Sequence, residues 1–218
     1  MIKLELKELT KIFERRVIFR NISLIKDAPG LFGVAGPNGS GKSTLVKVIT
    51  GLLSPTSGSV AFSAGGREFS PGEAINHFGF ASPYLVLYDE FSARENIEFS
   101  MKIRGLQFDE AYVDELLQHF SLLKRKNDPV RAYSSGMKQR LKVISAFAHK
   151  PELVILDEPT ANLDSEGKAR VYELAKIAAA EKLVIFATNE EDELAMCNEV
   201  LNINDYKLNN NTGKGAKV

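Results

Sequence analysis

A glycine-rich segment in the first quarter of the chain has the residue types that hold a phosphate group. It consists of Gly36, Pro37, Asn38, Gly39, Ser40, Gly41, Lys42, Ser43 and Thr44. The spacing is the G-x-x-x-x-G-K-[ST] pattern, in which glycines let backbone N–H groups curl around a phosphate. Lys42 supplies charge for the β and γ oxygens, and the Ser43 hydroxyl can ligate Mg²⁺. The segment predicts a nucleoside triphosphate site; the alternative is a turn that binds nothing.

Two adjacent carboxylates follow an apolar run later in the chain. Leu153-Val-Ile-Leu156 leads directly into Asp157 and Glu158. Because side chains alternate along a strand, the two carboxylates point to opposite sides and have different tasks. Asp157 suits the Mg²⁺ shell alongside Ser43, and Glu158 suits the orientation or deprotonation of an attacking water. The alternative is an ordinary acidic strand end.

Buried strands alternating with helices are expected to position these residues. Apolar runs predict strands at 31–35, 78–82, 153–156 and 183–187, and helical periodicity predicts helices at 43–52, 93–104, 109–122 and 135–149. Strands that are apolar throughout and separated by helices indicate a parallel sheet covered on both faces. The functional residues would then lie at the carboxyl edge of that sheet, where α/β folds bind ligands.

The N-terminal part has a different pattern. Alternating segments at 2–6, 16–19, 22–26 and 58–62 predict antiparallel strands, and 64–72 is expected to be a loop. The tail 209–218 has nothing to bury and is expected to be disordered.

Composition limits the possible functions. The 218 residues include 28 basic and 28 acidic side chains, so no global basic field favours nucleic acid, and no nucleic-acid partner is expected. The single cysteine excludes an intrachain disulfide framework. No apolar run reaches the ~20 residues of a membrane span. We therefore expect a soluble, cytoplasmic protein that reaches a membrane only through a partner.

Two further segments resemble the ATP-binding cassette (ABC) family. They are Tyr133-Ser-Ser-Gly-Met-Lys-Gln-Arg140 and Asp157-Glu-Pro-Thr-Ala-Asn-Leu-Asp164, in the family's order and spacing. The resemblance implies an α/β P-loop NTPase (RecA-like) fold, with a parallel sheet flanked by helices, an N-terminal antiparallel β subdomain and an inserted helical subdomain. It implies one nucleotide-binding domain over 1–208, with the core at 1–82 and 150–208 and the helical subdomain at about 83–149.

The resemblance also implies roles for residues outside the phosphate segment. Ser134, Ser135 and Gly136 would form the signature loop, which faces the ATP of a second copy or a paralogous cassette in a head-to-tail dimer. The alternative for this loop is a plain serine helix cap. Phe13 would stack on adenine, and its alternative is a core phenylalanine.

The sequence departs from the family at several places. Pro83 stands where the family usually has glutamine, so a contact to Mg²⁺ or water is missing or supplied by a neighbour. Asn189 stands where the switch histidine is usual; it can hydrogen-bond a γ-phosphate oxygen but cannot carry positive charge. The signature has Tyr133, Ser135 and Met137 where Leu, Gly and Gln are usual.

The leading functional hypothesis is the ATPase subunit of an ABC transporter. Lys42, Glu158 and Asn189 are its candidate catalytic residues, ATP and Mg²⁺ its cofactors, and a membrane-spanning permease its partner. The protein would lie peripherally on the cytoplasmic face of the membrane. The signature and compact length are similar to small exporter ATPases, including the haem-exporter type. The alternatives are a soluble nucleotide-gated assembly switch and a weakly hydrolysing regulatory cassette.

Overall fold

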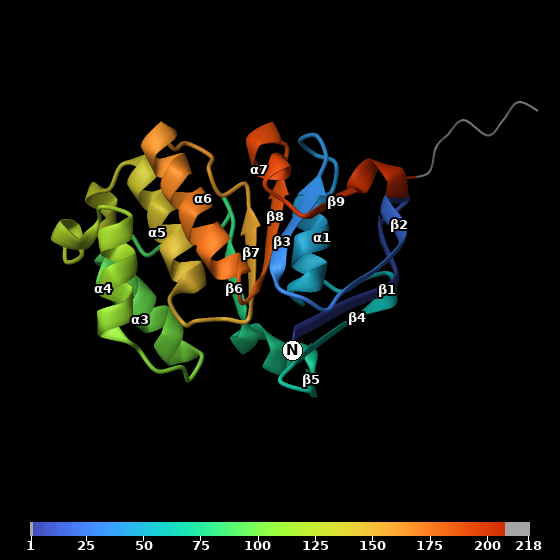
Figure 1. Ribbon diagram of the computed structural model, residues 1–218, viewed down its shortest axis with the longest axis horizontal. Coiled ribbons are helices and arrows are strands. Elements are labelled where there is room, and N and C mark those ends of the chain that lie inside the picture. The colour runs from blue at the N-terminus through green and yellow to red at the C-terminus, as the bar shows by residue number, and fades with distance from the viewer. Residues whose placement is uncertain (1, 208–218) are drawn as a thin grey trace, which may run out of the picture.

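The computed structural model describes residues 2–207 and folds into two sheets with helices on both sides of the larger one (Figure 1). The strands are β1 (Ile2–Phe13), β2 (Arg16–Lys26), β3 (Gly30–Ala35), β4 (Ser57–Ala64), β5 (Arg67–Phe69), β6 (Phe78–Ala81), β7 (Leu153–Asp157), β8 (Leu183–Thr188) and β9 (Glu199–Asn202). The α-helices are α1 (Lys42–Ile49), α2 (Pro71–Ala74), α3 (Ala93–Ile103), α4 (Glu110–His119), α5 (Ser135–Phe147), α6 (Ser165–Ala179) and α7 (Glu191–Ala195). Short 3₁₀ turns are η1 (Ile75–His77), η2 (Leu123–Arg125), η3 (Val130–Ala132) and η4 (Ile203–Tyr206).

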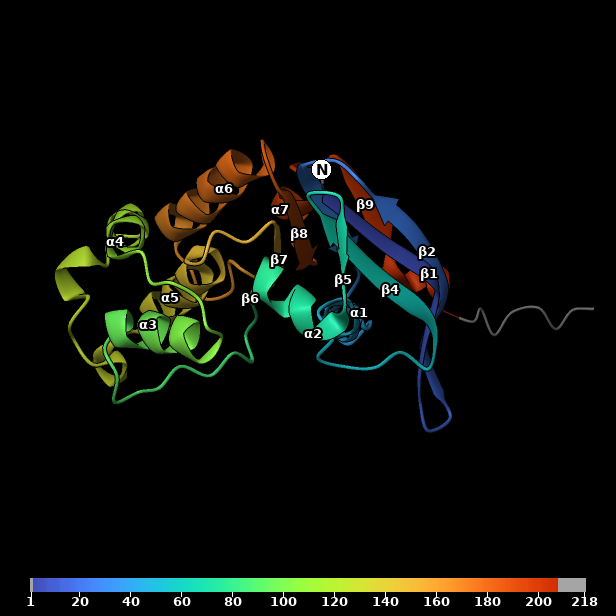
Figure 2. The same ribbon diagram turned by 90° about the horizontal axis from the view of Figure 1, so that it is seen from below.

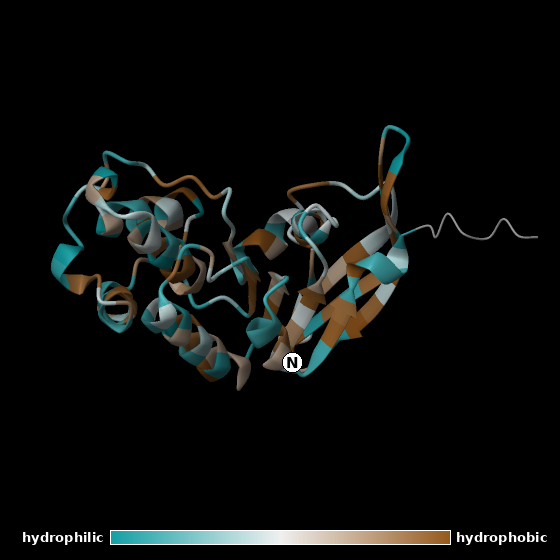
Figure 3. Cartoon of the chain, turned by 90° about the horizontal axis from the view of Figure 1, so that it is seen from above, coloured by the Kyte–Doolittle hydropathy of each residue, from teal (hydrophilic) through white to brown (hydrophobic). Residues whose placement is uncertain are grey.

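The larger sheet is parallel, with strand order β6-β7-β8-β3-β9. Its strands bury both faces, as their near-continuous apolar sequences predict. Along β7, Val154 and Leu156 pack into one hydrophobic cluster with α3 to α6, whereas Leu153 and Ile155 pack into a second with α1 and the other sheet. The parallel sheet is therefore the middle layer of the molecule. In Figure 3 the strands beside the N-terminus, which belong to the smaller sheet, carry both brown and teal stretches.

The smaller sheet is antiparallel, with strand order β2-β1-β4-β5. The segments expected at 16–19 and 22–26 are one continuous strand, β2. In Figure 2 the β1–β2 hairpin extends beyond the body of the molecule.

The prediction of a loop over 64–72 was wrong. Gly65 and Gly66 form the turn of a hairpin, and the short β5 pairs with β4 through Phe69 and Phe62. The helix α2 begins directly after it, with Ser70 as N-cap and Glu73 completing a capping box. The two glycines are typical of a loop, but here they make the tight connection that lets a three-residue strand pair.

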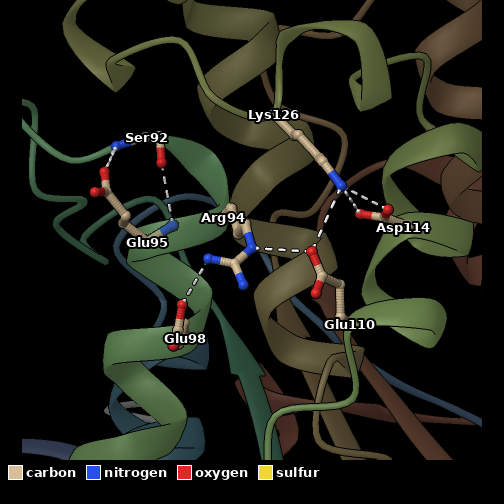
Figure 4. Close-up of polar contacts among 7 residues, drawn as sticks. All are labelled: Ser92, Arg94, Glu95, Glu98, Glu110, Asp114 and Lys126. Carbon is tan, nitrogen blue, oxygen red and sulfur yellow. Dashed lines mark hydrogen bonds and ion pairs between the residues drawn. The ribbon is translucent and has the colours of Figure 1, made fainter.

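Helices α3 to α5 form a group between β6 and β7 (Figure 1). An ion-pair network ties α3, α4 and the turn after η2 together (Figure 4). Arg94 pairs with Glu98 at 3.0 Å and with Glu110 at 3.2 Å, and Lys126 pairs with Asp114 at 2.6 Å. Glu110 also lies 3.8 Å from Lys126, so one carboxylate joins both cations. Individually, such half-exposed pairs contribute little, but a shared carboxylate fixes the relative placement of the three segments.

These features confirm the predicted fold class: a parallel sheet flanked by helices, preceded by an antiparallel β unit. Among residues 2–207, no helix has both the length and the apolar character that a membrane crossing requires. The tail predicted to be disordered, 209–218, lies outside the described residues.

Candidate functional site

The phosphate-binding segment lies between the end of β3 and the start of α1, at the carboxyl edge of the parallel sheet (Figure 1). Lys42 is 3% exposed, and its ammonium donates to the carbonyl oxygens of Gly36 at 2.8 Å and Pro37 at 3.4 Å. The first residues of the loop therefore surround the Lys42 side chain and hold its positive charge inside the loop. A bound anion can exchange with these carbonyls as the partner of the ammonium.

The backbone of this loop strongly favours glycine at position 41, directly before the lysine. Gly41 has a φ of 112°, and a Cβ there would lie 2.5 Å from Ile18 Cγ2. Gly41 is also the N-cap of α1, and no side chain caps the helix. The first N–H groups of α1 are thus left for a ligand, and the helix dipole favours an anion there. Gly39 has open space around it, as close approach of a ligand requires.

A buried carboxylate lies beside Ser43. Asp157, the last residue of β7, is 1% exposed, and its Oδ1 has no hydrogen-bond partner. Burial raises the pKa of the Asp157 carboxyl, while a hydrogen bond with Ser43 opposes the shift. An orphaned buried oxygen next to a hydroxyl suits a hard divalent cation, which would favour the charged form of the carboxyl. The residues present therefore fit Mg²⁺, held by Ser43 and Asp157.

Glu158 stands at a backbone position that most side chains avoid. Its φ is 48°, and its N–H donates to the carbonyl of Ala187 on β8 at 2.9 Å. Its carbonyl accepts from Gln139 of α5, at 3.3 Å, and the same amide donates to Pro159 at 2.9 Å. Left-handed backbone in a non-glycine residue persists only when surrounding contacts impose it, and such residues cluster at functional sites. These contacts turn the side chain out of the buried strand, and Glu158 lines a cavity of about 220 Å³.

The same cavity brings Asn189 close to Glu158. Asn189 follows β8, is exposed and lines the cavity together with Thr160 and Thr188. Glu193 of α7 also lines this cavity. It has no exposed surface, and its Oε1 accepts from the Thr160 hydroxyl at 2.6 Å. Burial raises the pKa of the Glu193 carboxyl, and the hydroxyls of Thr160 and Thr188 oppose the shift. Glu193 thus joins the segment after β7 to the segment after β8.

The predicted signature loop begins α5, on the other side of the segment after β7. Ser134 is the N-cap of α5, and its Oγ accepts from the N–H of Met137 at 3.3 Å. Ser134 and Ser135 are exposed, while Gly136 packs closely enough on Asn162 that a Cβ would lie 3.2 Å from its carbonyl oxygen. The serine cap considered as an alternative is present. The cap uses one N–H donor of the helix start, and Ser135 beside it is exposed.

Phe13 ends β1 near the tip of the β1–β2 hairpin. It is 44% exposed, and Lys11 Nζ lies 4.8 Å from its ring centroid. The alternative of a core phenylalanine is therefore wrong. An exposed aromatic ring is available for stacking, and its role toward adenine stays a prediction.

Three residues of this region were missed by sequence reasoning. Gln139 lies within the recognised motif, but its buried contact is made to main-chain carbonyls. Thr160 also lies in a recognised motif, but its role in holding Glu193 is visible only from the hydrogen bond that its hydroxyl donates to that residue. Glu193 belongs to the acidic run Glu190-Glu-Asp-Glu193, which is typical of a solvated helix face. Nothing in this run distinguishes the buried Glu193 from its exposed neighbours Glu190, Glu191 and Asp192.

Comparison with known proteins agrees with this geometry. The profile of the family described as "ABC transporter" matches residues 19–161. The lantibiotic transport ATP-binding protein SrtF of Streptococcus pyogenes is 33% identical over 186 residues, which are 85% of this chain and 79% of SrtF. The linearmycin resistance ATP-binding protein LnrL of Bacillus subtilis is 33% identical over 175 residues. Those residues are 79% of this chain but only 56% of LnrL, and the uncharacterised ATP-binding protein YcbN of the same organism is also matched over 56% of its length.

Solved structures show the same fold. An ATP-binding ABC transporter protein of Pyrococcus furiosus superposes with a TM-score of 0.80 at 22% identity, covering 94% of this chain and 99% of that one. A dimeric bacterial ABC transporter cassette gives a TM-score of 0.81 at 22% identity, covering 92% and 94%. The fold and the loop at its sheet edge define a P-loop protein. The chain belongs to the ABC transporter family.

Proposed function

We propose that this chain is the ATP-binding and ATP-hydrolysing subunit of an ABC transporter. The observation that carries the proposal is the orphaned, buried Asp157 Oδ1 beside Ser43, at the helix start where Lys42 lies inside a glycine loop. A carboxylate oxygen without a partner is costly in a protein interior unless it receives a cation. A Mg²⁺ complex of ATP supplies both the cation that Asp157 lacks and the anion that the α1 start lacks.

Hydrolysis would depend mainly on positioning and charge stabilisation. Lys42, Mg²⁺ and the N–H groups of α1 would hold the phosphates, since phosphoryl transfer needs little covalent help from the protein. Glu158 would orient or deprotonate the attacking water. Asn189 would donate a hydrogen bond to a γ-phosphate oxygen, and because it cannot carry charge we expect slow turnover.

A second cassette would complete the site. Ser134, Ser135 and Gly136 would face the nucleotide bound by the other copy, in a head-to-tail dimer with ATP in the interface. This arrangement is supported by their exposure at the start of α5 and by the likeness to a dimeric cassette. ATP would favour the closed pair, and hydrolysis the open one.

A membrane-spanning subunit would bind near the loop after β6. Large hydrophobic side chains are exposed there and on α3: Tyr84, Val86, Tyr88, Phe99 and Ile103. A cavity of about 500 Å³, lined in part by Tyr84, Leu85 and Arg104, opens beside them. Exposed apolar patches mark partner sites, and the transport and resistance functions in the relatives' names support a permease as partner. The protein would then act at the cytoplasmic face of the membrane.

Dimer formation and turnover test the nucleotide part of this proposal. Glu158→Gln should bind MgATP, lose hydrolysis and elute as a dimer in size-exclusion chromatography with light scattering. Lys42→Met is the matched control and should stay monomeric in the same MgATP. Turnover that is unchanged in Glu158→Gln would overturn the role of Glu158, and wild-type binding without hydrolysis would favour the regulatory cassette.

A photo-crosslinker at Val86 tests the membrane partner in the native cell. It should capture a multi-span membrane protein, whereas the same crosslinker at exposed Ile177 on α6 should not. Capture of soluble proteins alone at Val86 would favour the assembly switch.

A further inference from the structure

The loop that joins β6 to α3 is held from two sides by lysines. From α5, the Lys142 ammonium donates to the carbonyl oxygen of Pro83 at 2.7 Å. From α1, Lys47 Nζ lies 5.0 Å from the ring centroid of Tyr84. We propose that Lys142 and Lys47 are positioning residues that set the placement of α5 relative to α1 through this loop. The proposal rests on the proposed ATPase function, and it adds the residues that would relate the starts of the two helices.

Lys142 is committed to this contact. Within residues 2–207, the Pro83 carbonyl is the hydrogen-bond acceptor of its ammonium, and no carboxylate pairs with it. Burial, followed by repulsion from Lys138, lowers the pKa of Lys142. A half-buried ammonium without a counter-ion is costly, so a single good acceptor holds it in place.

The first four residues of the loop, Ser82 to Leu85, are bonded to one another, so this part can transmit a displacement. Pro83 has a fixed φ and no N–H, which leaves its carbonyl as its one backbone polar group. On either side of it, Ser82 Oγ accepts from the N–H of Tyr84 at 3.1 Å, and the Ser82 carbonyl accepts from the N–H of Leu85 at 3.1 Å. A shift of the Pro83 carbonyl therefore moves the Tyr84 ring.

The far ends of the two helices carry the candidate nucleotide contacts. Lys47 lies in the last turn of α1, the helix that begins at Lys42 in the phosphate loop. Lys142 lies two turns into α5, the helix that begins at Ser135. The path Lys47–Tyr84–Pro83–Lys142 thus connects the helix that would hold one ATP to the helix that would face the other.

A merely structural tether would leave turnover unchanged in a folded protein. The test compares Lys142→Met and Lys47→Met, separately and together, with Lys176→Met on the exposed face of α6 as matched control. Each single variant should lower kcat about five- to tenfold, which corresponds to about 1 kcal/mol, with the affinity for a fluorescent ATP analogue unchanged. Because both residues act through one loop, the double variant should lose no more than the more severe single one. Lys142→Arg, which keeps a donor, should recover most of kcat.

A distance measurement keeps the inference testable if the wild type does not hydrolyse ATP. Spin labels at exposed Glu68 on β5 and Glu115 on α4, in a Cys197→Ala background, report the placement of the helical group by double electron–electron resonance. Lys142→Met should broaden or shift the distance distribution, and Lys176→Met should not. Unchanged distances and unchanged kcat would overturn the inference, as would additive losses in the double variant. Absence of wild-type binding and hydrolysis would instead overturn the proposed function and leave the distance result to decide the role of Lys142.

Discussion

The starts of α1 and α5 are both candidate phosphate contacts, yet they are built differently. The start of α1 contains a buried lysine and is self-supporting: Lys42 donates to carbonyls of its own loop, and no side chain caps the helix. The start of α5 is exposed and capped by Ser134. It depends on a distant segment, since Gln139 holds the carbonyls after β7 and Gly136 packs on Asn162.

The difference indicates a division of tasks between the two helices. A buried, uncapped start offers several free donors, so it can bind an anion strongly within a single chain. An exposed start with one donor already used suits a weaker contact, made only when another molecule brings an anion to it. Changes at α1 should therefore abolish nucleotide binding, and changes at α5 should spare it but weaken the step that needs two copies.

The largest effect is expected at the lysine of the α1 start. Lys42→Met removes the charge inside the loop and should lower ATP hydrolysis by roughly 10²–10³-fold, the range for loss of one preorganised stabilising contact. Steady-state phosphate release measures this loss. A variant that retained more than a tenth of wild-type turnover would contradict the view that the α1 start carries the main phosphate contact.

Matched glycine substitutions compare the two starts directly. Gly41→Ala forces a side chain into left-handed backbone and against Ile18, so it should lower the free energy of unfolding by about 1–3 kcal/mol and abolish nucleotide binding. Gly136→Ala lies in a helix, where the gain in propensity offsets the close contact with Asn162, so stability should change by less than about 1 kcal/mol. Urea unfolding and nucleotide titration check both, and loss of monomer binding in Gly136→Ala would break the comparison.

A smaller effect is expected from the cap of α5. Ser134→Ala removes the acceptor for the Met137 N–H and should cost about 1 kcal/mol of unfolding free energy. Ser134→Gly should cost only a few tenths, because glycine is tolerated at the N-cap. Thermal and urea denaturation of the two variants give the difference. Equal losses in both would show that the hydroxyl does not stabilise the helix.

The smallest effect is expected in the pH dependence of the free energy of unfolding. It comes from Glu193, which holds Thr160 in the segment after β7. The pKa of Glu193 is raised in the fold by burial, so the folded protein holds its proton more tightly than the unfolded chain, in which the carboxyl has its ordinary pKa of 4.5. The stability that Glu193 contributes is thus fully present below that value and is lost as pH rises through the folded pKa. Glu193→Gln lacks this ionisation, and its stability relative to the wild type should increase from pH 5 to pH 8. A constant difference in urea unfolding across this range would contradict the expectation.

What could be predicted depended on how local the determining contacts are. The phosphate loop follows from a pattern within nine consecutive residues. The parallel sheet follows from continuous apolar runs, because strands of an antiparallel sheet with one face in solvent would alternate between apolar and polar residues. β5 was missed because three residues carry no periodicity, and its pairing with β4 shows only in the folded hairpin. Glu193 was missed because an acidic run is typical of a solvated face until packing buries one member of it.

The same reasoning explains why Lys142 was missed. Pro83 was recognised as a departure from the family, but nothing in the sequence around Lys142 indicates a contact with the Pro83 carbonyl. Its acceptor is a main-chain carbonyl 59 positions earlier, and every residue type carries such a carbonyl. A side-chain contact to the backbone cannot be predicted from the sequence, because no particular residue type is needed at the accepting position.

The projecting β1–β2 hairpin has a consequence for protease sensitivity. Its turn lies between Phe13, the last residue of β1, and Arg16, the first residue of β2, and Arg15 and Arg16 are both exposed. Exposed loop tips are preferred sites of nicking, and trypsin cleaves after arginine. Because β1 also pairs with β4 and β2 packs against η4, the two pieces of a nicked chain would remain assembled. Limited digestion would thus cut the β1–β2 hairpin next to Phe13 and leave the phosphate loop intact. The rate of this cleavage would show whether a nucleotide base lies against Phe13.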